Sequence, residues 1–400
     1  MGTLFEDTAA LDSAYHMATY ARKPVMFVRG DGMRLYDDDG REYLDFVSGI
    51  GVVNLGHAHP TVAAAIAEQS TKLVHVSNLF HVEHRAHLAE VLVTMAGGGR
   101  KVFFANSGAE SVEGAIKLAR RWGKLNKGPE CYRIVTAERS FHGRTLGALT
   151  ATAQPSKQEA FAPLLPGFAH VPLNDLSALE TAVDDTVCAV MLEVVQGEGG
   201  VHPCTSAYLT GVRRLCDERG VLLVLDEVQT GFFRTGPAFA HQSFGIEADI
   251  MTLAKSMANG LPIGAVVATD EVAAAFKPGD HGSTFGGGPV VCAAALATIR
   301  ALGEERLGER AIVVGAHLKN ALLELAERTG EITEVRGPGL MVAAQLARPI
   351  AAQIAEKALL RGVVLNNIGD SVIRFLPPLI CNEAEIDTLL GTLEAVVEEA

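Results

Sequence analysis

Cysteine is scarce in this sequence and never forms a closely spaced pair. There is no C-x-x-C motif, the signature of many zinc and redox sites. A chain of 400 residues also has enough material to bury a core without disulfides. We therefore expect reduced, mostly buried thiols in a cytoplasmic protein. The six cysteines are Cys131, Cys188, Cys204, Cys216, Cys292 and Cys381.

Long apolar runs and an excess of positive charge are also lacking. No run approaches the roughly 18 apolar residues that span a bilayer. Glu6, Asp7 and Asp12 stand where a signal peptide would carry basic residues, so we expect no such peptide. The 34 basic side chains are outnumbered by 47 acidic ones, giving a net charge of −13. This balance argues against binding to nucleic acids or anionic membranes, and anionic substrates would need locally placed arginines.

Strand and helix patterns alternate from about residue 85 to 300. Short, branched apolar runs predict buried strands, and the amphipathic segments between them predict helices. Such alternation is typical of an α/β fold in which helices flank a mainly parallel sheet. The expected strands are Lys101–Ala105, Arg133–Ala137, Cys188–Val195, Val221–Leu225, Asp249–Leu253 and Ile263–Ala268, and the expected helices are Ser111–Lys124, Ser177–Val183 and Ser206–Arg219.

The two ends of the chain have a different character. Residues 1–55 contain short strand signals separated by turns rich in Gly and Asp, which predict an antiparallel meander. Beyond residue 300 we expect a long helix, Leu302–Arg328, and then a mixture of short strands and helices. We predict a large domain at 56–300 and a smaller α+β domain at 301–400, with residues 1–55 forming part of the small domain.

An acid and a lysine follow two of the predicted strands. Asp226 ends the run Val221–Leu225, and Lys255 lies just beyond Asp249–Leu253. Ligands of open α/β sheets bind outside the carboxyl ends of the strands, so the two side chains could meet across one ligand. Pyridoxal phosphate (PLP) needs a lysine for a Schiff base and an acid against its ring nitrogen. PLP binding is therefore our working hypothesis, although most lone lysines are simply solvated.

Three loops offer further groups for such a ligand. Asn106–Glu110 lies where a strand ends and a helix begins, which makes it either an anion site or an ordinary N-cap. Phe141–Arg144 offers an aromatic ring that can stack and an arginine that can hold a carboxylate, although such an arginine more often forms a surface ion pair. His281–Gly288 adds the hydroxyls of Ser283 and Thr284.

Charged residues also occur in a glycine-rich loop and in an apolar strand. Glu193 and Glu198 belong to the loop Glu193–Gly200, where they face the expected ligand crevice or serve structural hydrogen bonds. Arg374 interrupts the apolar run Val372–Phe375. A charge in such surroundings needs a carboxylate partner, from the protein or from a ligand.

Two other kinds of site have weaker support. His81, His84 and His87 are spaced to lie along one side of a helix, but no further metal ligands stand nearby. We therefore predict no metal and a packing or capping role. The glycines do not form G-x-G-x-x-G between a strand and a helix, so a nicotinamide-dependent oxidoreductase is only an alternative.

Taken together, these motifs resemble the class III PLP-dependent aminotransferases. Any single motif is weak, but all of them in this order are specific, and the resemblance runs from about Val25 to the last helix. It implies PLP fold type I, with a large domain and a smaller α+β domain. The matching segments are Asn106–Glu110, Phe141–Arg144, Glu193–Gly200, Asp226–Gly231, Arg234–Gly236, Lys255 and Gly282–Thr284.

The resemblance implies how PLP is held. Lys255 would carry the cofactor covalently, Asp226 would pair with the pyridine nitrogen, and Gln229 would bond the phenolic oxygen. Phe141 would stack on the ring. Thr284 would reach the phosphate bound by the partner subunit, which implies an obligate homodimer. Ser107, Gly108 and Ala109 would hold the phosphate, and the remaining expected cofactor contacts are His142, Glu193, Val228 and Ser283.

The resemblance also implies how substrates are held. Arg144, helped by Asn78, would bind a substrate carboxylate. Arg374 would take the α-carboxylate of glutamate or 2-oxoglutarate, and Glu198 would cover Arg374 when the other amino donor is bound. The intact Lys255 argues against a family member that is only a PLP-binding scaffold.

Within the family, the nearest likeness is to the members that act on N-acetylornithine. This implies transfer of its δ-amino group to 2-oxoglutarate in arginine biosynthesis. Ornithine, succinylornithine, N-succinyl-diaminopimelate and 4-aminobutyrate are alternative donors for the same residues. Phe232–Phe233, Ser256–Asn259, Phe285 and Gly288 depart from the family pattern. We expect them beside the cofactor and the pocket mouth, where they would affect substrate choice.

Overall fold

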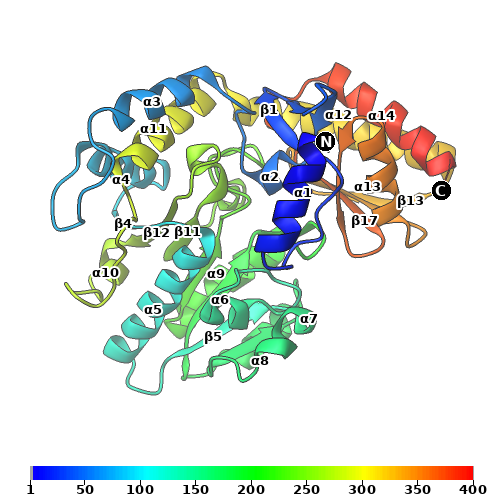
Figure 1. Ribbon diagram of the computed structural model, residues 1–400. Helices are drawn as coiled ribbons and strands as arrows, with labels where there is room; N and C mark the ends of the chain where they lie inside the picture. Colours follow the sequence, from blue (N-terminus) through cyan, green and yellow to red (C-terminus); the bar gives the residue numbers. More distant parts are fainter. Residues whose placement is uncertain (1–2, 400) are drawn as a thin grey trace.

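A seven-stranded sheet lies at the centre of the computed structural model, which describes residues 3–399 (Figure 1). Its order is β4-β12-β11-β10-β7-β5-β6. Neighbouring strands are parallel, except that β12 runs antiparallel to both β4 and β11. The predicted mainly parallel sheet is confirmed. Its strands are β4 (Arg100–Ala105), β5 (Arg133–Ala137), β6 (Phe168–Val171), β7 (Val187–Glu193), β10 (Leu222–Asp226), β11 (Ile250–Leu253) and β12 (Gly264–Thr269).

The alternating side chains of β10 explain why helices cover both faces of this sheet. Leu222 and Val224 pack with α5 (Gly108–Asn126) in one core cluster. Leu223 and Leu225 point the other way and join a second cluster that includes α9 (Ser206–Arg219). A strand that is buried on both faces has a continuous apolar sequence. This is the physical reason why the run at 221–225 predicts the central strand correctly.

Further helices pack beyond the β4 edge and beside the sheet. In Figure 1, α3 (Pro60–Ser70) and α11 (Pro289–Glu304) lie side by side, with α4 (Glu83–Met95) next to them. Within residues 3–399, no helix has the length and apolar character needed to cross a bilayer. The other helices of this part are α6 (Leu146–Ala151), α7 (Pro155–Gln158), α8 (Leu176–Ala182) and α10 (Asp270–Ala273).

The two ends of the chain meet through their strands. The N-terminal meander of β1 (Phe27–Asp31), β2 (Arg34–Asp37) and β3 (Glu42–Asp45) is antiparallel, as predicted. Its fourth strand, β15 (Val363–Val364), comes from the C-terminal region and runs parallel to β3. This pairing supports the proposal that residues 1–55 and 301–400 form one domain. Helices α1 (Leu4–Tyr15) and α2 (Ser48–Gly51) flank the meander in sequence.

The C-terminal region has its own sheet, covered by helices on the right of Figure 1. The strand order is β13-β14-β17-β16, and all three pairs are antiparallel. The strands are β13 (Ile332–Arg336), β14 (Val342–Leu346), β16 (Asn366–Ile368) and β17 (Val372–Phe375), and the helices are α12 (Leu307–Thr329), α13 (Ala351–Leu360) and α14 (Glu383–Glu398).

The long helix predicted at Leu302–Arg328 is confirmed as α12, but its predicted start is wrong. Two helices, α11 and α12, occupy this region, and Arg306 between them has a left-handed backbone with φ of 53°. Leu302 and Leu307 on either side of the break are both buried. The apolar periodicity therefore continues across the turn and conceals it. The polar strand β13 and the exposed helix α1 carry little apolar pattern, and neither was predicted.

The carboxyl ends of the parallel strands bring the predicted site residues to one edge of the sheet. Asp226 at the end of β10 lies opposite Glu193 of β7 and Thr252 of β11 in the strand register. Lys255 follows β11 by two residues, and Ser107 follows β4 by two residues. Sheet register alone therefore gathers side chains that lie far apart in the sequence.

Arg234 connects this edge to the chain ends. Its side chain is fully buried. Its Nη1 donates to the carbonyls of Leu340 and Pro377, and its Nη2 donates to Oδ1 of Asn54. The same Asn54 donates to the carbonyl of Phe232. Burial lowers the pKa of Arg234, since desolvation disfavours its charged form. One side chain thus joins the N-terminal, central and C-terminal parts of the fold.

We predict that Arg234→Met lowers the free energy of unfolding by about 3 kcal/mol, because buried acceptors lose a charged donor. Urea unfolding of the PLP-free protein measures this. The control is Arg214→Met, which changes a side chain that is 66% exposed on α9. Equal stability of the two variants would contradict the role assigned to Arg234.

Candidate active site

A cavity of about 460 Å³ opens at the carboxyl edge of the sheet. This volume is in the range of small-molecule sites. Asp226 and Lys255, predicted to face one ligand, both line it. The predicted site residues along its wall are Ser107, Gly108, Ala109, Phe141, His142, Arg144, Glu193, Glu198, Asp226, Val228, Gln229 and Lys255.

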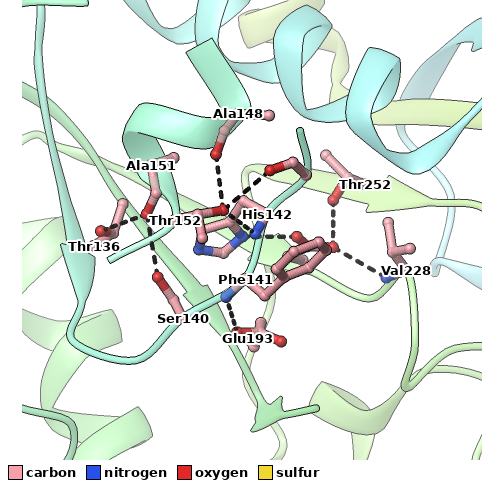
Figure 2. A network of polar contacts seen from close by, with 12 residues as sticks. Thr136, Ser140, Phe141, His142, Ala148, Ala151, Thr152, Glu193, Val228 and Thr252 are labelled. Carbon is pink, nitrogen blue, oxygen red and sulfur yellow. Dashed lines mark hydrogen bonds and ion pairs between the residues drawn. The ribbon is translucent and has the colours of Figure 1, made fainter. Parts of the chain in front are cut away.

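The Asp226 carboxylate is held by donors from Thr252, Val228 and His142, three residues that are labelled in Figure 2. Its Oδ1 accepts hydrogen bonds from the Thr252 hydroxyl at 2.9 Å and from the Val228 N–H at 3.1 Å. Its Oδ2 lies 2.7 Å from Nδ1 of His142. Each carboxylate oxygen can accept two hydrogen bonds, so Oδ2 has capacity for one more donor.

His142 is buried behind Asp226 and fixed by its backbone. Its N–H donates to the Thr152 hydroxyl at 2.8 Å (Figure 2). Burial opposes its charge, but the hydrogen bond to Asp226 and the charges of Asp226 and Glu193 raise the pKa of His142. Within residues 3–399, its Nε2 has no hydrogen-bond partner. The imidazole is thus placed to direct its proton at Asp226.

Glu193 braces the loop that carries Phe141. Its carboxylate accepts from the Phe141 N–H at 2.9 Å and from the Gly197 N–H at 3.1 Å. Burial raises the pKa of Glu193 to about 7. Its contacts are with backbone, so Glu193 fixes the positions of two loops at the cavity wall.

Lys255 lies in a strained turn directly after β11. Its backbone is left-handed, with φ of 44°, which is an uncommon conformation for a residue other than glycine. Burial lowers the pKa of Lys255 from 10.5 to about 8, although the charge of Glu198 acts in the opposite direction. A larger share of the amine is then neutral near pH 7 than for an exposed lysine, which makes it a better nucleophile.

The start of α5 has the free donors that the anion site predicted at 106–110 would need. Ser107 is the N-cap, and its hydroxyl accepts from the Glu110 N–H at 3.2 Å. The N–H groups of Gly108 and Ala109 have no acceptor among residues 3–399. A Cβ at Gly108 would stand 2.8 Å from Cγ1 of Val228, so this close packing requires glycine. Free N–H groups and the helix dipole together favour a phosphate.

Two arginines near the cavity differ in burial: Arg374 is buried and Arg144 is exposed. Arg374 on β17 is fully buried, and its Nη1 donates to Glu198 at 2.6 Å, so the predicted pairing of these residues is present. Attraction to Arg374 lowers the pKa of Glu198 in spite of the opposing effect of burial. Arg144 is exposed, with its guanidinium carbon 5.6 Å from the centre of the Phe141 ring.

Asn78, Ser283 and Thr284 do not line the cavity that holds Lys255. They line a second cavity, of about 830 Å³, near α4 and β4. Nδ2 of Asn78 donates to the carbonyls of Ser283 and Gly286. Within one chain, the structure therefore does not bring Asn78 to Arg144, because its amide is engaged with the loop of Ser283.

Other expectations need correction. Phe232 was expected near the pocket mouth, but it is fully buried and packs edge-on against Phe239.

Of the three histidines, His84 and His87 lie on α4, whereas His81 precedes it. Among residues 3–399, no group of three metal-binding side chains could hold an ion.

Sequence reasoning missed three residues at the site. Thr252 binds Asp226, and its place in the strand before Lys255 was the available signal. Asn366 binds Arg374, which no local motif announces. Lys157 on α7 lies 5.4 Å from the centre of the Phe141 ring, and burial, followed by the charge of Arg144, lowers the pKa of Lys157.

The lining of the cavity that holds Lys255 fits PLP. Asp226 keeps an acceptor site for a protonated ring nitrogen, and Lys255 supplies an amine for the aldehyde. The free N–H groups at the start of α5 suit the phosphate, and the Phe141 ring lies at the cavity wall. The cavity thus contains a complementary group for each end of the cofactor.

Comparisons with known proteins agree with this geometry. The family model for class III aminotransferases (Aminotransferase class-III) matches residues 16–397. A curated relative named acetylornithine aminotransferase, from Caldanaerobacter subterraneus, is 49% identical over 97% of this chain and 98% of its own length. Another of that name, from Gloeobacter violaceus, is 50% identical over 95% of each chain.

Solved structures give the same result for the fold. An ornithine aminotransferase from Toxoplasma gondii matches with a TM-score of 0.95 at 33% identity, covering 100% of this chain and 96% of that one. N-acetylornithine aminotransferase from Stenotrophomonas maltophilia matches with a TM-score of 0.85 at 36% identity, covering 98% of each. These likenesses leave the oxidoreductase alternative without support.

We predict that PLP attaches to the protein through Lys255, with a rate that rises with pH. The amine is protonated below its pKa of about 8 and neutral above it, so the rate should increase between about pH 7 and about pH 9. Borohydride reduction followed by mass spectrometry of the chain measures the attachment.

Lys255→Ala should abolish this trapping. The control is Lys101→Ala, which changes a side chain that is 73% exposed, and it should retain trapping in full. Undiminished trapping in Lys255→Ala would show that the cofactor is held elsewhere.

Proposed function

The chain belongs to the class III aminotransferases, which depend on PLP, and from that premise we propose that it transfers the terminal amino group of N-acetylornithine to 2-oxoglutarate. The products are N-acetylglutamate 5-semialdehyde and glutamate, in arginine biosynthesis. The observation that carries the proposal is the pair formed by the buried Arg374 and the half-buried Glu198 beside the cavity that holds Lys255. The names of relatives 45–50% identical favour N-acetylornithine as the donor.

Lys255 and Asp226 divide the chemistry between them. Bound PLP supplies an electron sink for the carbanion formed when a C–H bond of the amine-bearing carbon breaks. Nζ of Lys255 would remove that proton as a base and then, as an acid, deliver it to the cofactor. A lowered pKa suits both roles near neutral pH. Asp226, held by Thr252 and His142, would keep the ring nitrogen protonated.

One cavity must accept two different substrates in turn. Arg374 would bind the α-carboxylate of glutamate or 2-oxoglutarate, once Glu198 has moved aside. With the donor bound, Glu198 would cover Arg374 and cancel its charge. The lowered pKa of Glu198 means that it remains ionised and able to do so. Arg144, exposed at the mouth, would take the carboxylate of the donor.

Ornithine is the second candidate donor. The observation in its favour is the TM-score of 0.95 to the ornithine aminotransferase of Toxoplasma gondii. Sequence identity to that protein is 33%, lower than the 49% shared with the relative from Caldanaerobacter subterraneus. We therefore keep N-acetylornithine as the primary proposal.

We also propose that the enzyme is a homodimer whose subunits complete each other's sites. Leu79 is 88% exposed, Phe285 66% and Phe80 62%, around the second cavity that contains Ser283 and Thr284. A monomer rarely exposes such an apolar cluster. From this surface, Thr284 would reach the phosphate bound by the other subunit.

All six cysteines are unpaired and buried, which supports a cytoplasmic location.

A panel of donors tests the substrate proposal. We expect kcat/KM with N-acetylornithine to exceed that with ornithine, 4-aminobutyrate, succinylornithine or N-succinyl-diaminopimelate by at least about tenfold. Glutamate formation from 2-oxoglutarate is the measurement. A higher value for another donor would reassign the substrate, and absence of glutamate with every donor would contradict the proposal.

A charge in the exposed apolar cluster tests the dimer. We expect Phe80→Asp to raise the dissociation constant of the dimer by at least about tenfold, because a carboxylate would be buried at the interface. Light scattering after gel filtration measures the mass. Leu323→Asp, at a position on α12 that is 48% exposed, is the control and should remain dimeric. The assigned surface would be contradicted if both variants were monomeric or if both remained as dimeric as the wild type.

A further inference from the structure

Arg374 has a second partner, in addition to Glu198. Asn366 on β16 stands directly opposite Arg374 on the antiparallel strand β17. Its side-chain carbonyl Oδ1 accepts from Nε of Arg374 at 3.0 Å and from Nη2 at 2.6 Å. These contacts occupy one edge of the planar guanidinium. They leave Nη1 to face Glu198.

The two partners of Arg374 differ in how firmly they are held. Asn366 is fixed by the backbone register of its strand pair. Glu198 lies in the loop between β8 (Val195–Gln196) and β9 (His202–Pro203), next to Gly197, Gly199 and Gly200. Its side chain is 26% exposed. Asn366 therefore holds the arginine in place, whereas Glu198 is attached to a segment whose glycines permit rearrangement.

The two partners also differ in charge. Glu198 is the carboxylate that pairs with Arg374 among residues 3–399. Gln229, 3.4 Å from Nη1, is neutral, like Asn366. An aspartate at 366 would have nearly the same shape but would compensate the guanidinium permanently. With asparagine, removal of Glu198 leaves a positive charge that is already oriented and unbalanced.

We propose that Asn366 is a positioning residue that aims Arg374 and, by its neutrality, keeps the arginine charge free for a substrate carboxylate. The proposal rests on the proposed function, in which Arg374 binds 2-oxoglutarate and glutamate. Asn366 acts through Arg374, so its effect falls on the dicarboxylate half-reaction. A residue that served only the stability of β16 and β17 would affect both half-reactions equally.

The substitution Asn366→Asp tests this, with a control at the next residue. Asn367 stands opposite Ile373 on the same strand pair, so its side chain lies on the other face of the sheet. Its amide donates to the carbonyl of Gly369. Asn367→Asp adds the same charge one position away but does not reach Arg374. The two variants thus separate a local effect on Arg374 from a general effect of charge.

Half-reaction kinetics give the first measurement. We expect Asn366→Asp to raise the KM for 2-oxoglutarate and for glutamate by at least about tenfold. The KM for N-acetylornithine should change by less than about twofold, which is the variation expected between variants whose changed residue does not contact that substrate. Asn366→Ala removes the acceptor without adding charge and should give a smaller change in the same direction. Asn367→Asp should behave as the wild type.

Equilibrium binding gives a measurement that does not depend on catalysis. Glutarate has both carboxylates of 2-oxoglutarate and no reactive group, so its affinity by calorimetry, with and without PLP, reports on Arg374 directly. We expect Asn366→Asp to weaken glutarate binding by at least about tenfold. The double variant Glu198→Gln/Asn366→Asp has the same net charge as the wild type. Its acid, however, lies at position 366 on a strand and cannot move away from Arg374. Binding should therefore stay weak, whereas Glu198→Gln alone should bind at least as tightly as the wild type.

The outcomes separate this proposal from the one on which it rests. Wild-type affinity for glutarate in Asn366→Asp, or an equal loss in both half-reactions, would overturn the role of Asn366 alone. A wild-type enzyme that forms no glutamate from 2-oxoglutarate would remove the proposed function and this inference with it. Restored binding in the double variant would show that net charge, rather than a fixed acid, controls Arg374.

Discussion

Burial of the Asp226 carboxylate is the constraint on which the arrangement of the site depends. A buried carboxylate costs several kcal/mol unless it is paired and hydrogen-bonded. Its donors are Thr252, Val228 and His142. They come from β11, from the turn after β10 and from the loop after β5, so strand register and loop conformation must be correct together. A strand displaced by one residue would leave a buried charge unpaired. The fold and the electrostatics of the site therefore specify each other.

Positive groups gather around the cavity although the protein as a whole is acidic. The chain has a net charge of −13, which repels anionic substrates at a distance. Near the cavity, Arg144, Lys157 and the start of α5 contribute positive charge or positive dipole ends, and Arg374 is paired with Glu198. Nearby acids are either committed to partners or, like Glu193 with its pKa of about 7, partly neutral. Recognition of carboxylates and phosphate therefore depends on short-range contacts. Such contacts act over distances shorter than the Debye length. Surface charges that lie farther away are largely screened by salt.

The sequence predicted most of the large sheet and the placement of Asp226 and Lys255 at one cavity, because buried parallel strands and the residues at their ends leave a local signal. It did not predict the break at Arg306, since apolar positions continue on both sides of the turn. It could not find Asn366, whose role arises from cross-strand register and not from a neighbouring motif. Asn78 was assigned to Arg144 by resemblance, whereas within one chain it contacts the loop of Ser283. Contacts made between distant segments, or between subunits, are the ones that local patterns do not contain.

Rigid and movable parts of the site are divided according to what the reaction requires. In the proposed reaction Asp226 and Lys255 serve both half-reactions, and they stand at or just beyond the ends of buried strands of the central sheet. Arg374 and Asn366 are likewise fixed, as opposite residues of one ladder. Glu198 alone among these groups belongs to a glycine-rich loop, and it is the group that the proposed function requires to move between the two substrates. Elements with many buried contacts resist local opening, whereas exposed glycine-rich loops open at little cost. The proposed charge switch, made from a loop acid and a strand arginine, would therefore change the pocket without disturbing the sheet that holds the reacting centre.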